Sequence, residues 1–592
     1  MLWINLISDL SSHQAMKWNL DHLFEGKECS ELIDEVKSRV EDFEKHRENL
    51  SNLSVEDFLR VLREYEQISE ILSRLEGFAG LRLSENTSSP EANAQQSAIS
   101  ELSAEVSNRT MFFSLWFKGL PDDKAEKYIS GSGKYRYFLE RLRAYRPYTL
   151  KEREEQIISL KDLSGVEACT RIYDSVTNRF EFEYKGKKMT QEEINQFKTS
   201  KDRSERKASY DLVLSRYGEN QYVLGEVYKS IVNDWRNENV KIRGFESPIS
   251  VRNKANDIPD KAIEALLSVV RENIGLFREY FKLKANLLNI ENIDRYDLYM
   301  RYEDVEKEYS FEDSKRLVLE TYRDFDDRAY RLAKEIFDKG HVHAFPEKGK
   351  RSGAFCWTVT KDIAPYVLLN HVGKLKDAFT MAHELGHGIH GSCVKDQTHF
   401  TFHAPLPLAE TASIFGEMLL SKKLLSKASD EEKIAILVHD LDGQYASIAR
   451  QAYFVLFEIA AHSEIEKGAS WERLNELYLE NLKEQFAEVM PVPEVFKYEW
   501  SYIPHIHHTP FYCYAYAFGN LLVLALYKMY EEQGKAFVDK YFKILSYGGS
   551  KAPAKILSEV GIDITDKSFW RQGFEIIRRE VDELRRLIEK MS

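Results

Sequence analysis

The chain has few of the features that mark disulfide-rich or membrane-spanning proteins. It contains only five cysteines in 592 residues, and none of them forms a C-x-x-C pair. An odd number of scattered cysteines argues against a disulfide framework and favours a reducing compartment, so we expect a cytoplasmic protein. No apolar run approaches the ~20 residues that a membrane helix needs, so we expect no membrane partner.

Acidic residues outnumber basic ones, 96 to 83. The net charge is −13 and no basic patch dominates, which argues against nucleic acid as a partner. The first residues, 1–15, lack the basic segment of a signal peptide. We expect them to be an extension that is not native, with Met16 as the true start.

Apolar residues recur at helical spacing through most of the chain, in residues 30–110, 122–160, 190–345 and 430–490. Residues 179–188 alternate and then turn, which predicts a hairpin. Two short apolar runs, 354–359 and 366–370, predict two strands of a small sheet. We therefore expect a mainly α fold, with a helical N-terminal domain at 16–200 and a catalytic domain at 201–592.

The most informative motif is His383-Glu384-Leu385-Gly386-His387, which reads H-E-x-x-H. On a helix, positions i and i+4 lie on one face, so His383 and His387 can bind one metal ion together. Glu384 lies beside them and can take a proton from a water molecule. This pattern indicates a catalytic zinc site. Glycines at 386 and 388 would let another backbone approach the metal closely.

A catalytic zinc takes three protein ligands and keeps one open position. Glu410 is our expected third ligand, because it stands at the start of a fresh helix after a proline loop. Glu417 is seven residues later on the same helical face, and either glutamate could ligate the metal while the other supports it. The remaining alternatives are three nearby histidines, His390, His399 and His403.

A second candidate segment is rich in histidine and tyrosine. His505, His507, His508, Tyr512, Tyr514 and Tyr516 fall within twelve residues. Tyrosine and histidine can donate hydrogen bonds to an oxyanion that forms on an attacked carbonyl. We favour Tyr512 first, Tyr514 second, and His508 among the histidines. The alternative is an aromatic packing segment.

Several motifs in order make the chain resemble the oligoendopeptidase F group of the thimet oligopeptidase-like zinc metallopeptidases. The residues that carry this resemblance are WNLDHLF at 18–24, GKRSGAF at 349–355, PYVLLN at 365–370, AHELGH at 382–387, ETAS at 410–413, FYCY at 511–514 and GGS at 548–550.

The resemblance implies a zincin-type catalytic domain whose small sheet lies beside the metal helix, with the helical N-terminal part closing a deep channel. It implies one zinc per chain, held by His383, His387 and Glu410, with Glu384 as the base. It also implies that the strand at Gly353, Ala354 and Phe355 pairs with the backbone of an oligopeptide substrate. A second tyrosine of some relatives would fall on Gly519, so either Tyr514 or Tyr516 replaces it or its role is absent.

We therefore expect a zinc endopeptidase that cleaves short unfolded peptides. One rival is a metallocarboxypeptidase with the same metal motif, which would need a cation to hold a free carboxylate. Another is a peptide-binding protein with a structural zinc, which the lack of cysteine ligands disfavours. The sequence does not distinguish a monomer from a dimer.

Overall fold

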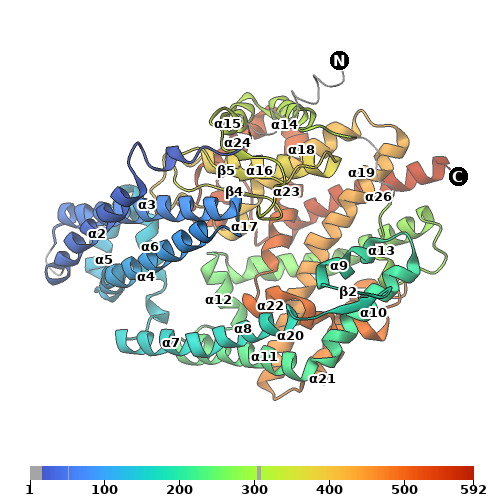
Figure 1. Ribbon diagram of the computed structural model, residues 1–592, viewed down its shortest axis with the longest axis horizontal. Helices are drawn as coiled ribbons and strands as arrows, with labels where there is room; N and C mark the ends of the chain where they lie inside the picture. The colour runs from blue at the N-terminus through green and yellow to red at the C-terminus, as the bar shows by residue number, and fades with distance from the viewer. Residues whose placement is uncertain (1–15, 51–52, 303–307, 592) are drawn as a thin grey trace. The chain divides into compact units, whose positions relative to one another are not determined.

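The computed structural model describes residues 16–50, 53–302 and 308–591, so the expected extension at 1–15 lies outside the described residues. Helices dominate and the strands are short (Figure 1), which confirms the expected mainly α fold. The chain forms two compact units. Unit 1 consists of the described parts of 1–146, 306–423 and 529–560, and unit 2 of the described parts of 147–305, 424–528 and 561–592. Each unit combines three separate stretches of the chain. The expected division into two domains at residue 200 stays a prediction.

Unit 1 contains a helical N-terminal bundle and the elements around residues 383–387. Phe43, Phe58, Leu62 and Phe113 are buried in the centre of the bundle. The main helices of unit 1 are α2 (Cys29–Glu44), α3 (Val55–Glu85), α4 (Pro90–Gly119), α5 (Asp122–Gly131), α6 (Arg136–Ala144), α14 (Phe311–Phe325), α15 (Asp327–Asp338), α16 (Leu375–Ser392), α17 (Leu406–Ala409), α24 (Lys535–Ser546) and α25 (Pro553–Ser558).

Unit 2 is also helical. Its last helix carries Phe574, Ile577, Val581 and Leu584 at alternating spacings of three and four, and this buried stripe faces α13 (Asp260–Leu287) and α19 (Asp430–Gln444). The elements of unit 2 are α7 (Glu152–Ser164), α8 (Val166–Thr177), the hairpin of β1 (Phe182–Tyr184) and β2 (Lys187–Met189), α9 (Gln191–Asn195), α10 (Arg203–Glu219), α11 (Gln221–Trp235), α12 (Pro248–Ala255), α13 (Asp260–Leu287), α19 (Asp430–Gln444), α20 (Arg450–Glu466), α21 (Trp471–Phe486), α22 (Pro504–His508) and α26 (Lys567–Met591).

Two helices contain residues assigned to both units, α18 (Thr411–Leu425) and α23 (Tyr514–Gln533). Within the described part of the chain, no helix is both long enough and apolar enough to cross a membrane.

The small sheet expected beside residues 383–387 is present in unit 1. It has three strands, β3 (Val342–His343), β4 (Phe355–Trp357) and β5 (Tyr366–Leu368), in the order β3-β5-β4. β4 pairs with β5 antiparallel and forms one edge of the sheet, and α16 packs against both strands. The expectation of a sheet beside this helix is therefore confirmed, although both predicted strands end earlier than expected.

The chain begins α16 just after a short turn. The Asp377 carboxylate accepts hydrogen bonds from the backbone N–H groups of Val372 and Lys374, each at 2.9 Å, which satisfies donors at the helix start. Further along α16, Gly386 faces the start of α18. A Cβ at Gly386 would overlap the backbone of Ala412 and Ser413. Another backbone therefore lies against α16 at this glycine.

Gly386→Ala should destabilise the protein, because the new methyl group meets backbone atoms that cannot rotate away. Overpacking of this kind costs about 1–3 kcal/mol, and the better helix propensity of alanine recovers about 1 kcal/mol at most. We expect a lower melting temperature, measured by circular dichroism. The matched control is Gly275→Ala within α13, where a Cβ would meet no atom within 4 Å. A melting temperature of Gly386→Ala equal to or above that of the wild type, as expected for the control, would contradict the prediction.

Candidate metal centre

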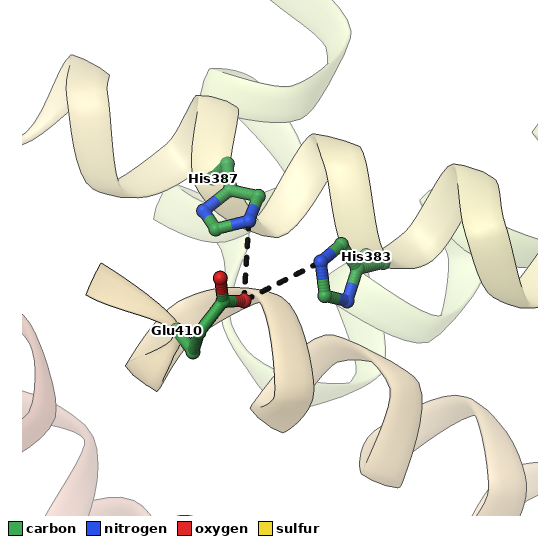
Figure 2. Close-up of side chains that lie close together, drawn as sticks. All are labelled: His383, His387 and Glu410. Carbon is green, nitrogen blue, oxygen red and sulfur yellow. Dashed lines mark ion pairs between the residues drawn. The ribbon is translucent and has the colours of Figure 1, made fainter. Parts of the chain in front are cut away.

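Helix α16 presents His383 and His387 on one face, and both side chains point toward Glu410 (Figure 2). The Nε2 atom of His383 lies 3.4 Å from Oε2 of Glu410, and Nε2 of His387 lies 3.3 Å from the same oxygen. One ligand atom from each of the three residues lies within 4.8 Å of the other two. Glu410 occupies the junction between α17 and α18, which sets its direction.

These distances fit a zinc ion. Ligands about 2.0–2.1 Å from a tetrahedral zinc lie about 3.3–3.4 Å apart, the spacing seen between Glu410 and each imidazole. Two imidazoles and one carboxylate are also the donor set of many catalytic zinc sites, which leaves a fourth position for water or substrate. The residues present therefore fit the metal that the sequence predicts.

A second set of side chains holds these three in place. Glu417 Oε1 lies 2.5 Å from Nδ1 of His383, so its carboxylate orients the ring and directs Nε2 toward Glu410. The Ser413 hydroxyl donates to Glu410 Oε2 at 2.7 Å. The Tyr322 hydroxyl donates to the carbonyl of Ala382 at 2.6 Å and ties α14 to α16. The structure thus groups Glu410 with the two Nε2 atoms and places Glu417 behind His383.

The charges of this group are strongly coupled. Burial lowers the pKa of His383, but the hydrogen bond with Glu417 and the charges of Glu417, Glu410 and Glu384 outweigh it and raise that pKa to about 9. Burial raises the pKa of Glu410, yet His387, His383 and Ser413 reverse this and lower it to about 2. Three carboxylates around two imidazoles create a negative centre that favours a cation.

Glu384 lies next to His383 on α16 and is only 6% exposed. Burial raises the pKa of its carboxyl group, since the charged form loses contact with water. A carboxylate with a raised pKa is a better proton acceptor than an exposed one at neutral pH, as a general base requires.

The other histidines considered as ligands lie outside this group. His390 is buried, His399 Nε2 lies 3.1 Å from the Ser73 hydroxyl, and the ring of His403 packs on Phe402 at 3.9 Å. His390 and His403 instead line a cavity of about 170 Å³ beside His387. Its other lining residues are Cys356, Trp357, Thr358, Gly391, Phe402, Ala404 and Ala409.

The predicted substrate-binding residues lie at the edge of the small sheet. Gly353 has a left-handed backbone (φ +80°), and its carbonyl accepts a hydrogen bond from Asn370 at 2.7 Å. Ala354 and Phe355 follow and lead into the edge strand β4. This turn fixes where the strand begins.

The histidine- and tyrosine-rich segment belongs to unit 2. His508 Nε2 lies 2.8 Å from the Asp174 carboxylate. Tyr514 is 0% exposed, and its hydroxyl accepts a hydrogen bond from Asn256 at 2.7 Å. Tyr512 is half-buried and meets the ring of Tyr516 edge-on at 5.4 Å. Among the favoured tyrosines, Tyr514 therefore serves the interior of unit 2, and Tyr512 is the more accessible.

Two supporting residues were not predicted. Ser413 stands three residues after Glu410, so helical spacing offered a weak signal for it. Tyr322 reaches α16 from 60 residues away, and no local sequence pattern indicates such a contact.

Comparison with known proteins identifies the family. The model of a family described as "Peptidase family M3" matches residues 196–576, and one described as "Oligopeptidase F" matches residues 116–182. An "Oligoendopeptidase F homolog" of Borreliella burgdorferi is 27% identical over 587 residues, which cover 97% of this chain and 98% of that protein. The "Oligopeptidase PepF" of Bacillus subtilis is 24% identical and covers 99% and 90%.

Solved structures share the fold. A protein of Chlamydophila abortus superposes with a TM-score of 0.86 at 24% identity, over 97% of this chain and 98% of that one. Oligoendopeptidase-F from Enterococcus faecium superposes with a TM-score of 0.71 at 22% identity, over 95% and 99%. Because the family match spans more than half of the sequence, the chain belongs to peptidase family M3 and is a metalloendopeptidase.

Proposed function

We propose that this metalloendopeptidase holds one zinc ion on His383, His387 and Glu410 and hydrolyses short unfolded peptides inside a closed channel in the cytoplasm. The observation that carries the proposal is the convergence of these three side chains beside the buried carboxyl of Glu384. The names of the relatives, oligoendopeptidase F and oligopeptidase, support peptides as the substrates.

A bound zinc ion would polarise the scissile carbonyl and lower the pKa of a water molecule. Glu384 takes the proton of the attacking water and then passes it to the leaving amine. Glu417 keeps His383 in the tautomer that presents Nε2, and Ser413 fixes the carboxylate of Glu410.

Peptide binding uses backbone and side-chain contacts in unit 1. The edge strand β4, entered through Gly353, Ala354 and Phe355, pairs with the substrate backbone as an added strand. The cavity beside His387 accepts one substrate side chain. Its aromatic and small lining residues favour an uncharged side chain there.

The segment at 505–516 supplies the groups that stabilise the oxyanion. We assign this role first to Tyr512, whose ring is half-buried. His508 and Tyr514 then support the segment through Asp174 and Asn256. The proposal as a whole is tested by cleavage of a quenched fluorescent peptide with and without a chelator, followed by mapping of the cut bond.

Glu384→Gln should keep the zinc and lose nearly all turnover, because the ligands remain while the proton acceptor goes. Loss of a general base costs about 10²–10⁴-fold in rate. Peptide cleavage and metal analysis on the same preparation measure both quantities. Turnover close to wild type in this variant would remove Glu384 from the role of base.

Glu410→Ala and Glu417→Ala form a matched pair that separates a ligand from its support. Glu410→Ala should lose most of its zinc and its activity. Glu417→Ala should weaken zinc binding by about 10–100-fold, the usual effect of losing an outer partner of a ligand. The two variants are compared by the zinc that each retains after dialysis against increasing concentrations of a chelator. Full occupancy in Glu410→Ala would assign the third ligand to another residue.

A closed channel predicts selection by size. The enzyme should cleave peptides made from a small stable protein and leave the folded protein intact. Mass spectrometry of both digestions measures the difference, and the unfolded full-length chain is the control for sequence preference. Efficient digestion of the folded protein would contradict the channel and leave the metal site unaffected.

A further inference from the structure

The turn that precedes Tyr512 has an unusual backbone conformation. Phe511 has a φ of +58°, although it is not a glycine and its side chain is large and buried. Aromatic residues rarely adopt this left-handed conformation, because it costs free energy that other contacts must offset. Strain of this kind often lies at functional sites.

Glu458 of α20 holds this turn. Its Oε1 accepts a hydrogen bond from the backbone N–H of Phe511 at 2.7 Å, and the side chain is 0% exposed. Its Oε2 has no hydrogen-bond partner within the described residues. Burial raises the pKa of Glu458 to about 8, against smaller opposing effects of the Phe511 N–H and Arg252.

Two further contacts hold the same turn. His462 lies one turn beyond Glu458 on α20, and its ring packs against the ring of Phe511 with centroids 4.7 Å apart. Arg252 of α12 donates from Nε to the carbonyl of Pro510 at 3.2 Å. Residues 510 and 511 are thus held from two helices, at the backbone and at the side chain.

A carboxyl group is an expensive way to fill this space if packing is all that it provides. Burying a polar group costs free energy unless hydrogen bonds compensate, and only one oxygen of Glu458 has such a bond. An apolar residue of similar size would pack without that cost. The carboxyl group offers one thing that such a residue cannot, an acceptor for the N–H of Phe511.

We infer that Glu458 is a positioning residue for catalysis: by fixing the left-handed turn at Phe511, it sets the direction of Tyr512. Tyr512 follows immediately in sequence, and its own N–H donates to the carbonyl of Thr509 at 3.2 Å within the same turn. A relaxed Phe511 would rotate the peptide plane that leads into Tyr512. This inference rests on the oxyanion role proposed for Tyr512.

Three variants of the zinc-loaded, full-length enzyme test it. Glu458→Met keeps the size of the side chain and removes the acceptor, so kcat should fall about 10–100-fold, as a misplacement of about 1 Å does, with little change in KM. Glu458→Gln keeps an acceptor and should retain most of kcat. Phe457→Leu is the matched control, because this neighbour packs on Tyr478 and Trp500 instead.

The control should lower the melting temperature and leave kcat unchanged. Wild-type kcat in Glu458→Met would overturn the inference. An equal loss of kcat in Phe457→Leu at the same loss of stability would also overturn it, since the effect would then be structural.

A double-mutant cycle shows whether Glu458 acts through Tyr512. Tyr512→Phe alone should lower kcat by about 10²–10³-fold, and Glu458→Met should add little further loss in that background. Additive losses would overturn the inference. Wild-type kcat in Tyr512→Phe would also overturn it, while leaving the zinc peptidase proposal intact, because that depends on Glu384 and on chelator sensitivity.

Amide hydrogen exchange gives a readout that does not depend on activity. The peptide that covers residue 511 should exchange faster in Glu458→Met than in the wild type, and Glu458→Gln should remain protected. Unchanged exchange in Glu458→Met would show that the carboxyl does not hold the turn. This result would stand even if the enzyme failed to cleave peptides and the proposed function were wrong.

Discussion

The proposed metal centre depends on one close contact, the approach of α16 and α18 at Gly386. Only a residue without a Cβ lets the backbone of Ala412 and Ser413 lie against α16 at this point. That approach brings Glu410, two residues before Ala412, to within 3.4 Å of both imidazole Nε2 atoms. Gly416 lies on α18, one turn after Ala412, and also needs to lack a side chain. A Cβ there would overlap the Tyr322 hydroxyl that donates to the carbonyl of Ala382.

This contact brings together groups that repel one another without a cation. Glu384, Glu410 and Glu417 all surround His383, and the pKa of His383 rises because of its hydrogen bond with Glu417 and the negative charges of all three carboxylates. A divalent ion held by two imidazoles and Glu410 would take over this role and release the proton from His383. Binding of such an ion would therefore be coupled to the stability of the α16–α18 contact.

The local part of this arrangement was predictable and the rest was not. The i, i+4 histidines and the small sheet follow from spacing, and both are present. Spacing could not separate Glu410 from Glu417, because both were assigned to one continuous helix. In the structure Glu410 lies at the junction of α17 and α18, so its direction differs from that of a residue within α18. The two units, each built from distant stretches, left no local sequence signal.

The histidine- and tyrosine-rich segment could also be predicted only in part from the sequence. Composition indicated that the segment matters, but the partners that separate its members come from distant helices. Asn256 donates a hydrogen bond to the hydroxyl of Tyr514, and the Asp174 carboxylate pairs with the imidazole of His508. What distinguishes Tyr512 is the strained residue before it. Glu458 interrupts the apolar run of residues 452–461 in α20, and this interruption was a weak sequence signal for the support.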